Sequence, residues 1–314
     1  MITTPASSIT KAASKQTYYT IRFLADRDRV EDAYRAYGYF RWVDDILDRR
    51  EPPGGRDEAA QRITFLERQK SLLEKCFQGG SFPDTTIEEQ MLVALAQSRD
   101  EKSSGLRSYL HHMMQVMDFD TRRRDRLISQ VELNEYTRWL ATAVTEAIHY
   151  FIGRDGYTPG DETRYLAVSA AHITHMLRDT FEDAEVGYYN IPREVIESNH
   201  IARLDVQTDA FRAWVKGRVQ LARDYFKAGK AYFARVENLR CRLACFAYIA
   251  RFEWLLDTIE REGYRLRPQY PERKSTRIGL WIGWLTLSSM IDRRGAYPGG
   301  RAWIRPIQFR GWKK

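Results

Sequence analysis

Clusters of glycine, proline and aspartate divide this chain into segments of helical length. Between the clusters, apolar residues recur with the 3.6-residue period of a helix, and the alternation typical of a strand is nearly absent. The sequence therefore predicts an all-α protein of roughly ten helices, with one domain over 1–300 and a separate tail at 301–314. Four of these turn clusters are EPPGG at 51–55, GGSFPD at 79–84, GRDGYTPGD at 153–161 and GYRLRPQYP at 263–271.

Charge and cysteine content narrow the possible partners. The 314 residues carry a net charge of +8, which suits an anionic membrane or a phosphorylated substrate. The basic residues are scattered among acids and no zinc-finger spacing occurs, so a nucleic-acid partner is not expected. Three cysteines are too few for a disulfide framework, and Cys241 and Cys245 are expected one turn apart in a helix core. A reducing, cytoplasmic location follows as the expectation.

The stretch VDDILD at 43–48 places acids on the apolar face of a predicted helix, Val30 to Asp48. A carboxylate on such a face requires a partner, and both Arg41 and a divalent cation are candidates. A solvated charged face is the alternative, but it would turn the acids away from the aromatic residues. At about 100° per residue, one stripe holds Ala33, Tyr34, Tyr37, Arg41, Asp44 and Asp48.

The stretch HITHMLRDTFEDAEVG at 172–187 repeats this pattern on a second predicted helix. Two such carboxylate pairs facing one cavity are stable only around cations, and hard oxygen ligands favour Mg²⁺. Because Mg²⁺ commonly shares its shell with phosphates, a phosphorylated substrate with an apolar portion is predicted. A di-iron bundle is disfavoured because no Glu-x-x-His pair falls on either stripe. The second stripe holds Tyr165, Val168, His172, His175, Asp179 and Asp183.

These motifs resemble those of the squalene/phytoene synthase family, which joins prenyl diphosphates head to head. YGYFRWVDDILD at 37–48 is similar to the family's YxxCRxxDDxxD, and LRDTFEDAEVGYYNIP at 177–192 to its LRDxxEDxxxGxxYLP. SKQTYYT at 14–20 and LDTIEREGYRLR at 256–267, followed by the basic PERKSTR at 271–277, resemble its terminal segments. The resemblance implies a single-domain isoprenoid-synthase-type helical bundle around a central apolar cavity.

The resemblance also implies a role for individual residues. Two or three Mg²⁺ ions, with Mn²⁺ able to substitute, would be held by Asp44, Asp48, Asp179 and Asp183. The implied catalytic residues are Tyr37, Arg41 and Arg178. The implied substrate-binding residues are Arg41, Tyr136, His175, Arg178, Phe252, Arg267 and Arg273.

The chain departs from the family pattern at three places. His172 and His175 stand where the family usually has a glutamine and an asparagine, so either His175 binds the diphosphate or the metal shell is smaller. Hydrogen-bonded packing is the alternative for both histidines, and it is expected first for His172. Two threonines, at positions 142 and 145, replace glycines of YCxxVAGxVG, which is expected to narrow the prenyl channel. Asn190 replaces the tyrosine of YLP.

The expected activity is Mg²⁺-dependent condensation of farnesyl or geranylgeranyl diphosphate to a squalene- or phytoene-type product. A class I terpene synthase or cyclase acting on one prenyl diphosphate is the alternative, and a non-catalytic binding or assembly relative is a third. No NAD(P)H cofactor is predicted, because no nicotinamide-binding fingerprint is present. The protein is expected as a monomer or homodimer. The basic, aromatic tail at 301–314 favours peripheral membrane contact, with an ordered strap on the domain as the alternative.

Overall fold

Helices make up every regular element in the part of the chain that the computed structural model describes, which confirms the all-α prediction. The described residues are 4–48, 58–80, 84–97, 104–153, 156–201, 206 and 208–271. The helices are α1 (Pro5–Ala13), α2 (Lys15–Leu24), η1 (Arg27–Arg29), α3 (Val30–Leu47), α4 (Glu58–Phe77), α5 (Ile87–Ala96), α6 (Ser104–Arg123), α7 (Gln130–Ile152), η2 (Glu162–Tyr165), α8 (Leu166–Arg178), α9 (Thr180–Glu185), α10 (Arg193–Ser198), α11 (Asp209–Phe233) and α12 (Leu239–Arg261).

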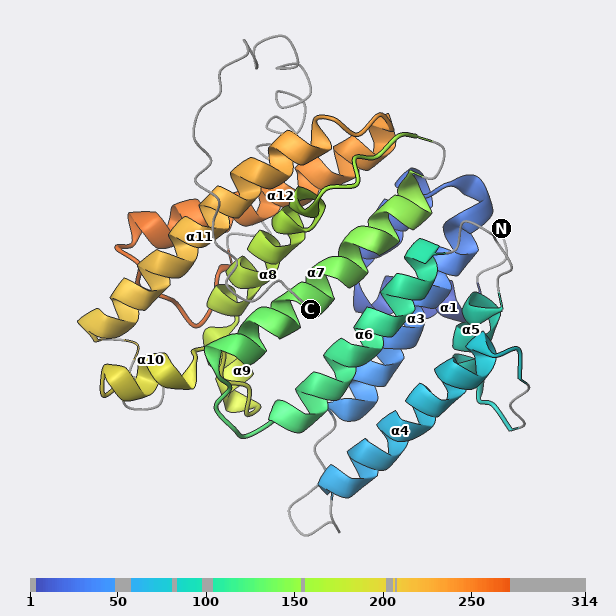
Figure 1. Cartoon of the computed structure of the whole chain (residues 1–314), viewed down its shortest axis with the longest axis horizontal. Helices are drawn as coiled ribbons and strands as arrows, with labels where there is room; N and C mark the ends of the chain where they lie inside the picture. Colours follow the sequence, from blue (N-terminus) through green and yellow to red (C-terminus); the bar gives the residue numbers. More distant parts are fainter. Residues whose placement is uncertain are drawn as a thin grey trace.

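Helix α7 lies in the middle of the bundle (Figure 1). On one side it packs along α6, which in turn contacts α3, and on the other side it packs along α8. Helices α11 and α12 complete the far side by packing on α8. Because the first acidic motif ends α3 and the second follows α8, this arrangement places the two motifs on either side of the α6–α7 pair.

Side-chain caps define where several helices begin. The Thr86 hydroxyl accepts a hydrogen bond from the backbone nitrogen of Glu89, and the Glu89 carboxylate accepts one from the backbone nitrogen of Thr86. The sequence DTTIEEQ predicts a capping box at Thr85 or at Thr86, and the structure forms it at Thr86. Ser129 and Glu132 form the same box at the start of α7. The N-terminal amide groups of these helices are therefore satisfied within the local sequence.

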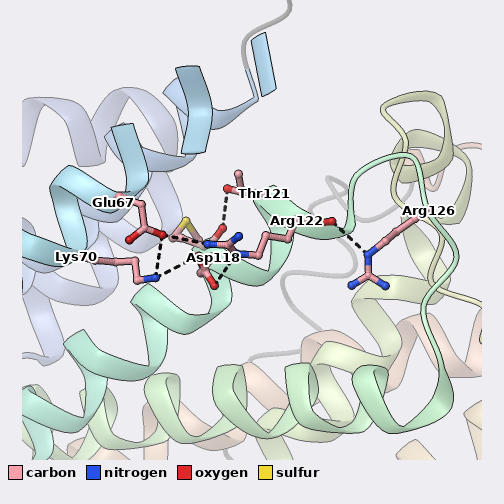
Figure 2. A network of polar contacts seen from close by, with 7 residues as sticks. Glu67, Lys70, Asp118, Thr121, Arg122 and Arg126 are labelled. Carbon is pink, nitrogen blue, oxygen red and sulfur yellow. Dashed lines mark hydrogen bonds and ion pairs between the residues drawn. The ribbon is translucent and has the colours of Figure 1, made fainter. Parts of the chain in front are cut away.

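A network of ion pairs joins α4 to the outer face of α6 (Figure 2). Arg122 reaches Glu67 at 3.0 Å and Asp118 at 3.0 Å, while Lys70 lies 3.1 Å from Glu67 and 3.5 Å from Asp118. All four side chains are substantially exposed, so each pair contributes little by itself. The network marks this side of α6 as a solvent-facing surface.

Helices α8 and α11 approach each other most closely at Gly229. A β-carbon added there would lie 2.5 Å from the β-carbon of Ala167 and 2.8 Å from its backbone nitrogen. Gly229→Ala is therefore expected to destabilise the protein by about 1–3 kcal/mol, because the clash outweighs the better helix propensity of alanine. Urea unfolding, followed by circular dichroism, measures the difference.

Gly217 provides a matched control on the same helix. Apart from the neighbouring backbone of its own helix, no atom of the described residues lies within 4 Å of the position that its β-carbon would take. Gly217→Ala is therefore expected to stabilise the protein by about 0.5–1 kcal/mol. Equal effects of the two substitutions would show that the α8–α11 contact is looser than described.

Several sequence predictions concern residues outside the described part. They are the tail at 301–314, the domain boundary at 300 and Arg273. Among the described helices, none combines the length and the apolar character needed to cross a membrane.

Candidate active site

Helix α3 carries the first acidic motif, and its predicted bounds are confirmed to within one residue. Ala33 and Tyr34 are buried, whereas Asp44 lies at the rim with 40% of its side chain exposed, and Asp48 caps the C-terminal end. Arg41 forms an ion pair with Asp44, 3.2 Å between Nη1 and Oδ2, and a second with Asp45. The predicted stripe thus runs from buried residues at Ala33 and Tyr34 to partly exposed acids at the C-terminal end of α3.

The second motif differs from the prediction of one continuous helix. Helix α8 ends at Arg178 and α9 begins at Thr180, so Asp179 is the residue between them, with φ −96° and ψ 9°. The hydroxyl of Thr180 donates to the carbonyl oxygens of Met176 at 2.8 Å and Leu177 at 3.2 Å, and such back-bonding bends helices. The backbone bond from Asp183 to Asp179, at 2.7 Å, nevertheless keeps these two acids one turn apart.

Two contacts bring the motifs together across 140 residues of sequence. The Tyr188 hydroxyl, just after α9, donates to Asp48 at 3.5 Å. Arg124, at the end of α6, donates to the carbonyl oxygen of Leu47 at 3.3 Å and to that of Val186 at 3.2 Å. One arginine therefore joins the end of the first motif's helix to the turn that follows the second motif.

Asp120, on α6, is a further carboxylate between the two motifs. Its charge acts on Asp44 and Asp48 in the first motif and on Asp183 in the second. The Tyr136 hydroxyl donates to Asp120 Oδ2 at 2.9 Å, and Arg123 Nε donates to Oδ1 at 2.6 Å. The site thus contains five neighbouring acids rather than the four predicted.

Arg123 is the buried cation that holds this acidic cluster. Only 5% of the residue is exposed, and its Nη1 donates to Asn190 Oδ1 at 2.8 Å. Asn190 in turn donates from Nδ2 to Asp183 Oδ2 at 2.6 Å, which links α6 to the second motif. Burial by itself would lower the pKa of Arg123, but the charge of Asp120 and other neighbours raises it, so the guanidinium stays charged.

The carboxylates repel one another. Loss of water around Asp44, and then the charge of Asp48, raise the pKa of Asp44 to about 7, although Arg41 opposes the shift. Loss of water and the charge of Asp179 likewise raise the pKa of Asp183 to about 7, against the opposing charge of Arg123. Burial also raises the pKa of Asp48. Loss of water is the first cause of all three shifts, and the charges of neighbouring aspartates add to it.

Metal-free protein is expected to lose stability as the pH rises from about 4 to about 7. An aspartate in an unfolded chain has a pKa near ~3.9, whereas Asp44 and Asp183 have values of about 7 in the fold. Between those limits the folded state binds more protons than the unfolded state, so a rising pH favours unfolding. Thermal unfolding midpoints at about pH 5 and about pH 8 measure the fall. A double Asp44→Asn, Asp183→Asn variant that falls equally would contradict this origin.

The two histidines of the second stripe have different surroundings. His175 is 48% exposed, lies 3.7 Å from Asp179 and sets its ring edge against Phe252. His172 is buried, and its ring meets that of Tyr136 edge to face, with 5.0 Å between centroids. Burial, His175, Arg123 and Arg218 lower the pKa of His172 well below its usual value, so this imidazole is neutral. His175 therefore lies beside Asp179 of the second motif, whereas His172 is buried against Tyr136.

The remaining predicted residues fall into two groups. Arg178 forms a bidentate contact with Asp179, with Nε donating to Oδ1 at 2.6 Å and Nη2 to Oδ2 at 2.5 Å. Tyr37 lies half-buried one turn before Arg41. Tyr136 and Phe252 are buried in aromatic clusters next to the site. Arg267 instead contacts Glu262 at 3.1 Å and the ring of Tyr270, in the segment after α12.

Aromatic rings line the acidic cluster on its inner side. Phe119 stacks on Tyr136 and meets Trp139 edge to face, with 5.1 and 6.0 Å between ring centroids. The Arg123 guanidinium lies 4.8 Å from the ring centroids of both Tyr136 and Tyr188. This arrangement combines acids, cations and apolar rings within a few side chains.

A pocket lies beside the second motif. Its wall includes Thr180, Tyr188 and Asn190, together with apolar residues of α10 and α11. This pocket lies on the α11 side of the motif and is not lined by α3 or α7. The predicted central apolar cavity therefore stays a prediction, as does the narrowing by Thr142 and Thr145.

No three Cys, His, Asp or Glu side chains within the described ranges are close enough to form a metal site by themselves. The donors present are hard carboxylate oxygens, which is the chemistry that suits Mg²⁺. Mg²⁺ usually completes its shell with water and substrate phosphates, so a preformed protein cage is not required. The donor chemistry fits the predicted metal, whose presence stays a prediction.

Sequence reasoning missed Asp120 and Arg123 although a signal was available. Asp120 follows the buried Val116 by four residues, and Arg123 follows Asp120 by three, so both continue the buried face of α6. The run DFDTRRRDR at 118–126 mixes acids and bases and resembles a solvated helix end. Its exposed members, Asp118 and Arg122, do form such a surface (Figure 2). Helical phase separates the two sets.

Solved structures define the class of fold. A dehydrosqualene synthase in complex with a ligand superposes with a TM-score of 0.66 at 16% identity, over 90% of this chain and 94% of that one. A squalene synthase from Alicyclobacillus acidocaldarius gives a TM-score of 0.62 at 19% identity, over 83% and 94% of the two chains. The architecture is therefore that of the isoprenoid synthase fold, as predicted.

Sequence comparison then identifies the family. The sequence model of squalene/phytoene synthases matches residues 10–278, so this chain belongs to the squalene/phytoene synthase family. The presqualene diphosphate synthase of Zymomonas mobilis is 28% identical over 204 residues, which are 64% of this chain and 64% of that relative. The match thus spans just under two thirds of the relative's length. The resemblance read from the motifs is confirmed.

Proposed function

We propose that this protein is a prenyltransferase that ionises an allylic prenyl diphosphate, farnesyl or geranylgeranyl, and joins two such molecules head to head with release of diphosphate. The observation that carries the proposal is the meeting of two aspartate motifs, from α3 and α8–α9, around Asp120. Family membership supports the same class of reaction.

Asp44, Asp48, Asp179 and Asp183 would hold Mg²⁺, in two or three ions, or Mn²⁺ in its place. When bound, the metal neutralises the diphosphate as it leaves. Loss of water, and then the charge of a neighbouring aspartate, raises the pKa of Asp44 and of Asp183. A bound cation would offset both effects, which supports a metal at this place.

The chain's own residues perform the other tasks of the reaction. Arg41 and Arg178 lie beside the two motifs and bind and orient the diphosphate oxygens. The rings of Phe119 and Tyr136 face the same region and stabilise an allylic cation through their π-electrons. The packed apolar residues beneath exclude water, which would otherwise quench that cation.

Incubation with Mg²⁺ and farnesyl or geranylgeranyl diphosphate tests the proposal. Extracts are expected to contain a product with the carbon count of two substrate molecules, and free diphosphate should accumulate. A product with the carbon count of one substrate molecule would instead establish the terpene synthase alternative. The buried Thr145 hydroxyl favours this alternative, because it has no hydrogen-bond partner among the described residues. Substrate binding without diphosphate release would establish a non-catalytic relative.

We also propose a cytoplasmic location with peripheral membrane contact through the tail at 301–314, and a monomer or homodimer in solution. The tail carries five basic residues and no acid, interleaved with apolar and aromatic residues. Flotation with anionic liposomes should be weaker for a protein lacking residues 301–314. Equal flotation of both forms would reject the tail as the contact.

A further inference from the structure

We propose that His172 is the proton acceptor of the coupling reaction, with its Nε2 atom facing the carbocation. The inference rests on the proposed function and adds a residue that the family pattern, with glutamine at this position, does not supply. The observation behind it is a buried nitrogen atom without a hydrogen-bond partner in the described part of the chain. His172 is only 6% exposed, and its Nε2 has no hydrogen-bond partner among the described residues.

A buried polar atom without a partner is costly, so its retention needs a reason. The nearest ring is that of Tyr136, edge to face with His172, whose hydroxyl is already committed to Asp120. Tyr136 stacks on Phe119, so the imidazole borders the aromatic surface on which a cation would be stabilised. His172 thus places a bare nitrogen next to the expected position of positive charge.

The coupling chemistry requires such a group. After the first diphosphate leaves, the C2–C3 double bond of the second molecule attacks the allylic C1, and the positive charge moves to C3. The C1–H bond then breaks, its electron pair closes a cyclopropane onto C3, and the proton must go to a base. The Nε2 atom takes up this proton, so that His172 becomes an imidazolium. His172 then passes the proton to the released diphosphate and returns to its neutral form.

Other candidate bases near the aromatic surface are occupied. Asp120 accepts hydrogen bonds from Tyr136 and Arg123, and Asp183 accepts one from Asn190. Loss of water raises the pKa of Tyr136 well above its usual value, so its hydroxyl stays protonated. Neutral imidazole is the uncharged base that a cavity excluding water can hold at little cost.

The test uses full-length protein, Mg²⁺ and farnesyl diphosphate, with three substitutions. His172→Gln restores the family's residue, and His172→Ala opens space for added imidazole. His149→Ala is the matched control, because His149 is also buried but its Nε2 has a partner, the Tyr232 hydroxyl at 3.1 Å. His149 lies roughly 20 Å along α7 from Tyr136.

Both His172 variants are expected to lower kcat by about 10²–10⁴-fold with KM changed less than about threefold. Substrate deuterated at C1 should reveal a primary isotope effect in His172→Gln that is smaller in the wild type. Imidazole should raise turnover of His172→Ala and not of His149→Ala. Unfolding midpoints are measured beside turnover to separate loss of the fold from loss of the proton acceptor, and His172→Ala is expected to lower the midpoint because it leaves a cavity.

The inference would be overturned if the wild type is active and His172→Gln has an unchanged kcat. It would also be overturned if His172→Gln shows no isotope effect and imidazole does not rescue His172→Ala. Either result would show that Nε2 holds an ordered water only. A wild type that releases no diphosphate from any prenyl diphosphate would instead overturn the proposed function. The two failures are therefore distinguishable in one set of assays.

Discussion

Asp44→Asn and Asp183→Asn are each expected to lower prenyl diphosphate turnover by on the order of 10²–10³-fold or more. Each substitution removes a negative oxygen from a cluster that would hold cations against the leaving diphosphate, where electrostatic contributions are large. Because Asn keeps the size and hydrogen-bonding capacity of the side chain, packing should change little. Diphosphate release, measured as a function of Mg²⁺ concentration, should show lower kcat and a weaker apparent affinity for the metal.

Asp118→Asn is the matched control on the outer face of α6. Asp118 pairs with Arg122 and Lys70 in the solvent-facing network, away from the motifs (Figure 2). Its turnover should stay within about twofold of the wild type, because exposed pairs contribute little. Full turnover in Asp44→Asn would reject the metal-holding role of the first motif.

Arg123→Met is expected to destabilise the protein by about 3–5 kcal/mol. The substitution keeps much of the apolar stem but leaves Asp120 without its cation and Asn190 without a donor, in a place that water reaches poorly. It also removes the guanidinium from the faces of Tyr136 and Tyr188. Urea unfolding, followed by tryptophan fluorescence, provides the measurement.

The neighbouring Arg122 tests whether burial causes this effect. Arg122→Met removes a cation with two acidic partners as well, but at 48% side-chain exposure. It should cost less than about 1 kcal/mol. A similar loss in both variants would show that Asp120 and Asn190 find water when Arg123 is absent.

Local patterns sufficed to predict the helix that carries the first motif and the cap at Thr86. The phase of Asp44 relative to Tyr34 follows from helix geometry alone, so no tertiary contact was needed. The same spacing indicated the partner motif at Asp179 and Asp183, and Tyr188 and Arg124 show how the two motifs meet.

Helical phase could have placed Asp120 on the inward face of α6, but the break at Asp179 lay beyond such patterns. Thr180 has no sequence signature that distinguishes a hydroxyl bonding its own helix from one facing solvent, and this choice bends the chain. Asn190 could be recognised as a departure from the family, but its link between Asp183 and Arg123 depends on packing between distant segments. Tertiary contacts therefore decide which polar residues join the site.

The position of Asp120 between the motifs also couples ligand binding to the fold as a whole. A ligand that engages acids of α3, α6 and α9 together cannot bind a partly unfolded chain, so its affinity adds to the free energy of unfolding by mass action. At a concentration of about 100 times the dissociation constant, this addition is about 2.7 kcal/mol. Screening diphosphates for the rise in melting temperature would therefore rank candidate substrates, because the same three helices must come together for folding and for binding.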